Sequence, residues 1–210
     1  LGDDACTVRA LELAATHYPK PDIWNNLMTL MLRANASSEN ALLNIYRLSF
    51  EVGAMRRGDD YTEMAQRAIE KGLPGEAQRT LEAAFAAKVF TEKRDIDRNQ
   101  RLLNSAKERA AADRASLAKQ DRDAAANKSA DADIRVGQAY MSYGQYPQAV
   151  AALQRGIGKG TATDPAEAQL VLGIAHLRGG NKAEAAKAFR TVKGDQDMQR
   201  IAKLWSLRAQ

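Results

Sequence analysis

Few side chains of this 210-residue chain have the types and spacing that catalysis or metal binding requires. Cys6 is the single cysteine, so no disulfide can form within the chain, and the two histidines are His17 and His176. These residues lie too far apart in sequence for a paired-cysteine or His-Glu-x-x-His zinc motif. We expect His176 to pack between helices and Cys6 to serve as a small apolar residue. The chain is therefore predicted not to be an enzyme and to have no metal or cofactor.

A glycine-rich segment at residues 156–161, Gly-Ile-Gly-Lys-Gly-Thr, has some of the composition of a phosphate-binding loop. The spacing fails, because Leu153 stands where that motif has its first glycine and Gly160 stands where Ser or Thr should follow the lysine. The segment is also predicted to end a helix rather than to follow a strand. We expect no nucleotide binding here.

Small and large residues recur along the chain at a fixed offset of 36 positions. The first set is Gly137, Tyr140, Gly144, Ala149 and Leu153, and the second is Gly173, His176, Gly180, Ala185 and Phe189. Two periods before the first set, a third copy contains Gly72, Ala77 and Leu81. A period of this length with two helical apolar stripes is typical of an α-solenoid, because each helix pair must stack on its neighbours to bury its apolar face. The predicted fold class is all-α, an α-solenoid of stacked helix-turn-helix repeats.

Local signals place the helix boundaries within this frame. Gly72, Gly144 and Gly180 fall between the two helices of a pair, where a left-handed residue commonly ends a helix. Helix starts are predicted at Pro74, at Pro147, at Asp164-Pro165-Ala166-Glu167 and at Asn181 with Glu184. Gly137 and Gly173 are predicted to be packing sites, where two helices approach closely.

The repeat resembles the tetratricopeptide repeat (TPR), in which a large residue, Leu-Gly, Tyr, Gly, Ala, Phe and Ala stand at set positions. The residues that match are Val136, Gly137, Tyr140, Gly144, Tyr146, Ala149 and Leu153, and then Leu172, Gly173, Gly180, Ala185 and Phe189. The match is less complete over residues 61–84, where Ala65 replaces the usual glycine, and over residues 24–53. The chain is thus similar to a divergent, bacterial-type member of this family.

The repeat frame treats residues 1–210 as a single solenoid. Its segments are a half repeat (1–20), a degenerate repeat (21–57), a repeat (58–91), a degenerate charged repeat (92–130), two repeats (131–164 and 165–194) and a C-terminal capping helix (195–210). Because the chain begins at Leu1 with half of a repeat, we expect it to be a fragment or a processed form.

Residues 92–130 depart from the repeat pattern and are rich in charge and alanine, without Gly or Pro. Two structures are compatible with this segment. Apolar residues spaced by seven would suit one long helix of about 50 Å, and these are Ile96, Leu103, Ala110, Leu117 and Ala124. The repeats on either side stay in phase across the interval, which favours a degenerate helix pair with a break between Glu108 and Arg114. The charges, which alternate in sign, predict a solvated helix face.

Charge and hydropathy narrow the choice of partner. The formal net charge is +5, but no run of Lys or Arg is interleaved with aromatic residues, so nucleic acid is not an expected partner. Basic residues outnumber acidic ones in residues 178–208, and we interpret this segment as a solvated helix surface rather than a site for an acidic partner. No apolar stretch approaches the roughly eighteen residues that a membrane span needs.

The resemblance implies a function through the concave surface, which in this family receives an extended peptide or a helix. The positions expected to face this groove are Thr62, Gln66, Ile69, Ile134, Gln138, Met141, Leu170, Ile174 and Leu177. They lack the Lys and Asn residues with which one subfamily clamps a terminal carboxylate. We expect the five aliphatic residues of the last two repeats to form an exposed apolar stripe. The alternative is that neighbouring repeats, or a segment outside this chain, bury them.

The predicted function is a non-enzymatic scaffold that binds a peptide segment or a partner helix of another protein in the concave groove. Two alternatives are a self-assembly module forming homo-oligomers, through an apolar edge left by the N-terminal half repeat, and an accessory domain of a larger protein. The chain loosely resembles exported repeat proteins of Gram-negative bacteria. Since a low cysteine content fits both cytoplasm and periplasm, we favour the periplasm on that resemblance.

Overall fold

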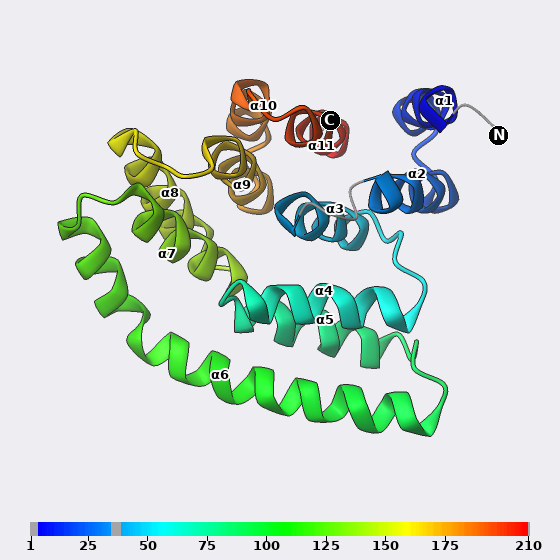
Figure 1. Ribbon diagram of the computed structural model, residues 1–210, viewed down its shortest axis with the longest axis horizontal. Coiled ribbons are helices and arrows are strands. Elements are labelled where there is room, and N and C mark those ends of the chain that lie inside the picture. The colour runs from blue at the N-terminus through cyan, green and yellow to red at the C-terminus, as the bar shows by residue number, and fades with distance from the viewer. Residues whose placement is uncertain (1–3, 35–38, 210) are drawn as a thin grey trace.

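The computed structural model describes residues 4–34 and 39–209, and within these ranges it contains eleven helices and no strand. In chain order they are α1 (Asp4–His17), α2 (Pro21–Ala34), α3 (Glu39–Glu51), α4 (Gly58–Glu70), α5 (Pro74–Ala86), α6 (Lys93–Ala126), α7 (Ala130–Ser142), α8 (Tyr146–Lys159), α9 (Pro165–Arg178), α10 (Lys182–Thr191) and α11 (Gln196–Arg208) (Figure 1). Consecutive helices pack on one another along the chain. The predicted all-α solenoid of stacked helix pairs is confirmed.

Glycine turns separate the two helices of the pairs α4–α5, α7–α8 and α9–α10. Gly72, Gly144 and Gly180 have φ values of +71°, +73° and +83°, in the left-handed region that residues with a Cβ rarely adopt. The predicted turn positions are therefore confirmed. The second helix of each pair starts at once, because Pro74 and Pro147 lie in the first turns of α5 and α8.

The two predicted side-chain caps are also present. The Asp164 carboxylate accepts a hydrogen bond from the Glu167 backbone N–H at 2.8 Å, which starts α9. The Asn181 amide oxygen accepts one from the Glu184 backbone N–H at 3.2 Å, which starts α10. Each cap satisfies one of the backbone donors that a helix N-terminus leaves without a partner.

Gly137 and Gly173 are packing sites, as predicted. A Cβ at Gly137 would lie 2.5 Å from Cγ of Leu153, and one at Gly173 would lie 2.3 Å from Cε1 of Phe189. Both distances are far below van der Waals contact. The missing side chain therefore allows the first helix of each pair to approach the large residue on the second.

Residues 93–126 form one uninterrupted helix, α6, that spans one side of the molecule (Figure 1). The predicted helix pair in residues 92–130, with a break between Glu108 and Arg114, is wrong. Four of the residues spaced by seven, Leu103, Ala110, Leu117 and Ala124, are buried, whereas Ile96 is exposed. Without Gly or Pro nothing interrupts the helix, and a single long helix fills the interval of a helix pair while leaving the flanking repeats in phase.

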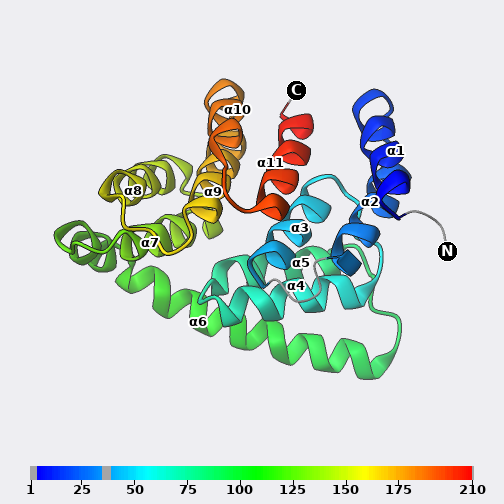
Figure 2. The same cartoon turned by 45° about the horizontal axis from the view of Figure 1, so that its top comes forward.

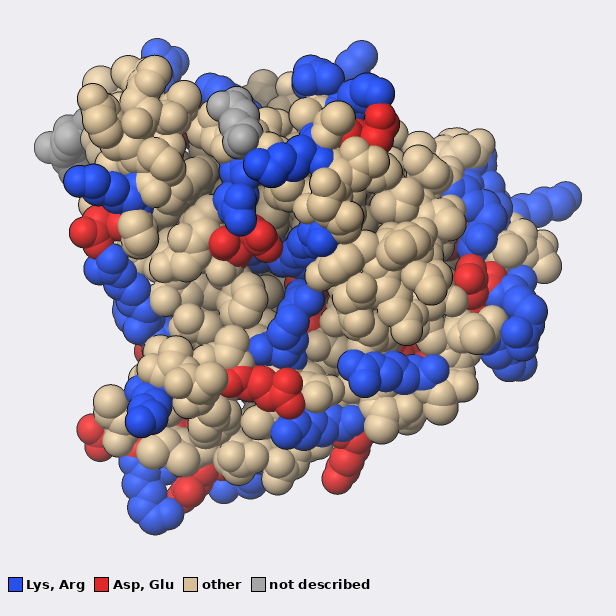
Figure 3. Space-filling model, turned by 180° about the vertical axis from the view of Figure 1, so that it is seen from behind, with Lys and Arg blue, Asp and Glu red and all other residues tan. Residues whose placement is uncertain are grey.

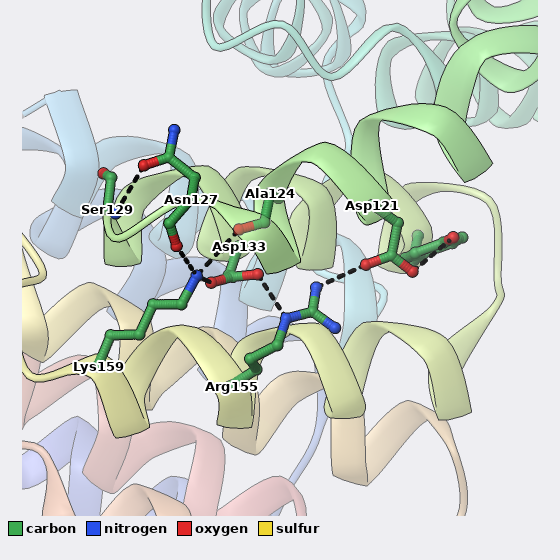
Figure 4. A network of polar contacts seen from close by, with 8 residues as sticks. Asp121, Ala124, Asn127, Ser129, Asp133, Arg155 and Lys159 are labelled. Atoms are coloured by element: carbon green, nitrogen blue, oxygen red, sulfur yellow. Dashed lines mark hydrogen bonds and ion pairs between the residues drawn. The ribbon is translucent and has the colours of Figure 1, made fainter.

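α6 packs its N-terminal half on α5 and its C-terminal half on α7 and α8. In the first half, the Thr62 hydroxyl donates to the buried Asn99 side chain at 2.9 Å. In the second half, Arg155 of α8 donates to Asp121 at 2.5 Å and to Asp133 of α7 at 2.6 Å, which joins three helices (Figure 4). These contacts fix α6 along the solenoid, although most of its surface is charged.

α3 lies in the middle of the molecule, between the α4–α5 pair on one side and α9 and α11 on the other (Figures 1 and 2). Every residue from Ala41 to Ser49 is buried. The Asn40 amide donates to Asp164 at 2.8 Å, which ties the start of α3 to the start of α9. The solenoid therefore curls tightly enough for its own third helix to fill much of the concave side.

α11 follows the last pair and lies between α10 and α1 (Figure 2). Trp205 is fully buried and its ring stacks on Phe189 at a centroid distance of 6.3 Å. Arg200 donates to Glu12 of α1 at 2.7 Å, which links two helices from opposite ends of the chain. In residues 4–34 and 39–209 no helix combines the length and the apolar character that crossing a bilayer requires.

Candidate functional site

Most residues predicted to line a peptide groove are instead part of the hydrophobic core. Leu170 and Ile174 are fully buried, and Met141 is 1% exposed. Ile134 and Leu177 are also buried. The expected exposed apolar stripe is therefore wrong. These residues are buried because α7 packs against α6, α8 and α9, and α9 packs against α8, α10 and α11.

The three predicted groove residues of α4 do not form a common surface either. Thr62 is buried against α6, Ile69 is partly buried, and Gln66 is exposed. Gln138 is buried, and its side-chain oxygen lies 3.4 Å from Nη2 of Arg47. The structure thus does not bring the nine predicted positions together as one groove.

The centre of the concave side holds an ion pair between Arg47 of α3 and Glu76 of α5. Nη2 of Arg47 lies 2.7 Å from Oε2 of Glu76, and both side chains are at most 1% exposed. Nε of Arg47 also donates to this carboxylate, and Nη1 donates to Asn44 at 2.9 Å. Burial alone would raise the pKa of Glu76, but the charge and hydrogen bonds of Arg47 reverse this and hold that pKa below its usual range.

A second charged contact connects α3 to α9 and α11. Nε of Arg178 donates to Glu51 at 3.2 Å, and the Arg178 guanidinium lies 5.9 Å from the centre of the Trp205 ring. Burial, together with the charge of nearby Arg79, lowers the pKa of Arg178 from its ordinary value. These contacts support the packing of α3 in the centre of the molecule.

An open cavity of about 610 Å³ lies between α6, α7, the α4–α5 turn and the α8–α9 connection. We call it the α6–α7 cavity. Two of the nine predicted groove residues, Ile134 and Gln138, line it. Its charged lining residues are Asp113, Asp123, Asp131, Asp164, Glu167, Lys71 and Arg135.

Most carboxylates of the α6–α7 cavity already hold structural hydrogen bonds. Asp113 accepts from the Tyr143 hydroxyl at 2.6 Å. Asp131 accepts from the backbone N–H of Thr163 at 2.9 Å and from its hydroxyl at 2.6 Å, and these bonds lower the pKa of the Asp131 carboxyl. Asp164 caps α9 and accepts from Asn40, as described above. These groups contribute negative charge to the cavity while holding its walls together.

Glu167 differs from the other carboxylates of the cavity. It is 8% exposed, and its Oε1 is buried without a hydrogen-bond partner. Burial raises the pKa of its carboxyl, and the positive charges of Arg47 and Lys71 oppose this rise. A buried oxygen without a donor is unfavourable by about 1–3 kcal/mol, so it is a cost of the fold.

Sequence reasoning identified Asp164 and Glu167 only as the cap and third residue of a helix start. It did not single out Asp113, Asp123 or Asp131. These residues lie on α6, α7 and α9, and no spacing along the chain signals that they share a cavity. Whether these carboxylates share a cavity depends on how the long helix α6 packs against α7.

A second open pocket of about 600 Å³ lies between α1 and α11 and is lined by Arg9, Glu12, Gln199, Arg200 and Lys203. The Glu12 carboxylate there already accepts hydrogen bonds from Arg200 and Lys203. Figure 3 shows Lys and Arg in separate groups over the face opposite to that of Figure 1, with acidic residues beside several of them. In residues 4–34 and 39–209 no three His, Cys, Asp or Glu side chains are grouped so as to hold a metal ion. His176 is partly buried, and this burial lowers its pKa.

No protein-family model matches this chain, and a comparison with curated protein sequences finds no similar one. Functional inference therefore depends on the repeat pattern and on the geometry of the concave side.

Proposed function

We propose that this chain is a non-enzymatic binding module of the tetratricopeptide-repeat type, and that the α6–α7 cavity receives a peptide segment of a protein partner. The observation that carries this proposal is the cavity itself, which opens between packed helices and has a volume of about 610 Å³. This volume lies within the range of about 300–1,000 Å³ that is typical of ligand sites. The cavity is therefore large enough to enclose several side chains.

The polar lining of the cavity favours an extended segment over a helix, because a helix satisfies its own backbone hydrogen bonds and does not need side-chain amides as partners. An extended segment of a few residues fits, and its backbone needs hydrogen-bonding partners. The side-chain amides of Gln120, Asn127 and Gln138 line the cavity and can supply them.

The repeat pattern supports the family part of the proposal. The glycine turns and the close approach of Gly137 to Leu153 and of Gly173 to Phe189 occur at the positions on which the resemblance rests. Ile134 and Gln138, which the resemblance places on the concave surface, line the α6–α7 cavity. The proposed site is thus a restricted part of the surface that solenoids use for binding.

Selection from a phage-displayed library of random eight-residue peptides tests this proposal. The blocking variant is Ala132→Trp, because Ala132 is partly buried on α7 and lines the cavity. The matched control is Ala125→Trp, on an exposed alanine of α6 outside the cavity. We expect the selected peptides to bind the wild type and the control equally and to lose most of their affinity for Ala132→Trp.

Circular dichroism melting establishes that both tryptophan variants are folded. If the library yields no binding peptide, or if the selected peptides bind all three proteins with equal affinity, the proposed function is wrong.

A further inference from the structure

A separate pocket of about 340 Å³ lies between the C-terminal ends of α3 and α9, the middle of α5 and the start of α8. We call it the Arg79 pocket. Its lining combines aromatic and aliphatic side chains with charged ones, and the residues are Phe50, Glu51, Arg79, Tyr146, Leu177 and Arg178. None of them lines the α6–α7 cavity, so the two sites are distinct. The volume lies within the range of about 300–1,000 Å³ that is typical of sites for small ligands.

Arginines outnumber carboxylates around this pocket. The charged groups that act on Arg178 from the neighbouring helices are Arg47, Arg79, Glu51 and Glu76. Glu76 is held by Arg47 in the buried ion pair. Glu51 lies 3.2 Å from Nε of Arg178 and 3.7 Å from Nη2 of Arg208. Both carboxylates are therefore already paired with other arginines.

Arg79 is left without a partner in this cluster. It is partly buried, and within residues 4–34 and 39–209 its guanidinium forms no ion pair and donates no hydrogen bond. Burial and, after it, the like charge of Arg79 lower the pKa of Arg178. An anion bound to Arg79 would offset the repulsion between these two guanidinium groups.

The two arginines contribute differently to the pocket. Arg178 is 7% exposed and is engaged with Glu51, so it contributes positive potential rather than a contact. Arg79 is more accessible and can contact a ligand directly. The hydroxyl of Tyr146, which is partly exposed, donates no hydrogen bond to a described residue and is available as a second donor.

The lining also indicates the class of anion. A guanidinium group presents a planar fork of donors that matches a carboxylate. The rings of Phe50 and Tyr146 and the side chain of Leu177 form an apolar wall beside Arg79. An inorganic anion would leave this wall without a contact, and a cationic ligand would be repelled.

We propose that the Arg79 pocket binds a small organic carboxylate with an apolar body, and that Arg79 is the residue that holds the carboxylate. The Tyr146 hydroxyl donates a second hydrogen bond to it, and the apolar body packs against Phe50 and Leu177. This site is separate from the α6–α7 cavity and does not depend on the function proposed for that cavity.

NMR chemical-shift titration with 3-phenylpropanoate tests this inference. We expect binding in about the millimolar range, as is usual for a ligand of this size. Acetate lacks the apolar body, inorganic phosphate has no carboxylate or apolar body, and 3-phenylpropan-1-ol lacks the negative charge. Each of these three probes should bind more weakly than 3-phenylpropanoate by about tenfold or more.

Variants of Arg79 test the residue itself. Arg79→Gln should weaken the binding of 3-phenylpropanoate by about tenfold or more, because it removes the charged hydrogen bonds. Arg79→Lys keeps the charge but loses the planar fork, so its affinity should lie between those of the wild type and Arg79→Gln. The matched control is Arg109→Gln, on an exposed arginine of α6 outside the pocket, which should bind like the wild type. Circular dichroism melting establishes that the variants are folded.

The outcomes separate this inference from the proposed function. If the wild type does not bind 3-phenylpropanoate, or if folded Arg79→Gln or Arg79→Lys binds it as tightly as the wild type, the inference is wrong. Equal affinity for the alcohol would reject the role of charge, and equal affinity for acetate or phosphate would reject the role of the apolar wall. Ala132→Trp, which blocks the α6–α7 cavity, should bind 3-phenylpropanoate like the wild type. Failure of the peptide selection would therefore leave this result unaffected.

Discussion

Two polar regions of the concave side lie close together and differ in how completely they are paired. In the first, Arg47 and Glu76 form a fully buried ion pair, and Asn44 and Gln138 accept further hydrogen bonds from Arg47. In the second, Glu167 is also buried but one of its oxygens has no partner. Gln138 belongs to both, since it contacts Arg47 and lines the α6–α7 cavity.

This difference separates a fully paired buried group from a partly paired one. Burying a charge is unfavourable unless its partners are complete, and Arg47 with Glu76 satisfies that condition within the fold. Glu167 satisfies it only in part, because one of its oxygens receives no hydrogen bond within the fold. We therefore expect changes at the first region to reduce stability much more than changes at the second.

The largest effect is expected when the buried pair is broken. Arg47→Met leaves the Glu76 carboxylate buried without its cation, and we expect it to lower the free energy of unfolding by about 3–5 kcal/mol. Urea denaturation followed by circular dichroism measures this change. Adding Glu76→Met should restore much of the lost stability, because two apolar residues then replace the pair.

The matched control for this pair is the exposed ion pair of α6, Lys93 with Asp97. Lys93→Met should change stability by no more than about 0.5 kcal/mol, because exposed pairs contribute little. Equal effects of Arg47→Met and Lys93→Met would contradict the structural role of the buried pair.

An intermediate effect is expected in the packed interface between α9 and α10. In Gly173→Leu, the new side chain meets the Phe189 ring, and we expect a loss of about 1–3 kcal/mol through overpacking. Thermal denaturation measures it. Gly158, where an added Cβ would meet no atom within 4 Å, is the control position, and Gly158→Ala should be tolerated. An unchanged melting temperature for Gly173→Leu would reject the packing role.

The smallest effect on stability is expected at Glu167. The contribution of Glu167 to stability depends on pH with the opposite sign to that of Glu76. A lowered folded-state pKa means that Glu76 stabilises the fold above its unfolded-state pKa, and this contribution is lost as pH falls toward the lowered value. A raised folded-state pKa means that Glu167 stabilises the fold at low pH, and this contribution is lost as pH rises through the raised value.

The free energy of unfolding of Glu167→Gln should therefore differ little from that of the wild type at pH 4, and should equal or exceed it near neutral pH. Urea denaturation at several pH values between 4 and 8 measures the free energy of unfolding of both proteins. A large loss of stability at neutral pH in this variant would show that the carboxylate is needed by the fold itself, and the contrast between the two polar regions would then be lost.

Local features of this protein were predictable from the sequence because they depend on residues close together in the chain. The left-handed turns at Gly72, Gly144 and Gly180 follow from the absence of a Cβ, and the caps at Asp164 and Asn181 follow from the reach of a short polar side chain. The repeat period predicted stacked helix pairs, because neither helix of a pair can bury its apolar face alone.

The candidate site was only partly predictable. Ile134 and Gln138 were placed on the concave side and do line the cavity, but Leu170 and Ile174 were expected to be exposed and are fully buried. An aliphatic residue on the first helix of a repeat has the same sequence signature whether it faces solvent or a packed helix. The curvature of the solenoid decides whether such a residue is exposed or buried. The periodicity of the sequence carries no information about this curvature.

The sequence alone determined the helical repeat, the turns, the helix starts and the close contacts at Gly137 and Gly173, since each follows from the conformational limits of a few neighbouring residues. The tertiary structure alone decided that α3 fills the centre and that Asp113 and Glu167 share one cavity. The physical reason is that these features depend on contacts between helices that are not consecutive in the chain, such as α3 with α11 and α5 with α7, whose geometry is set by packing.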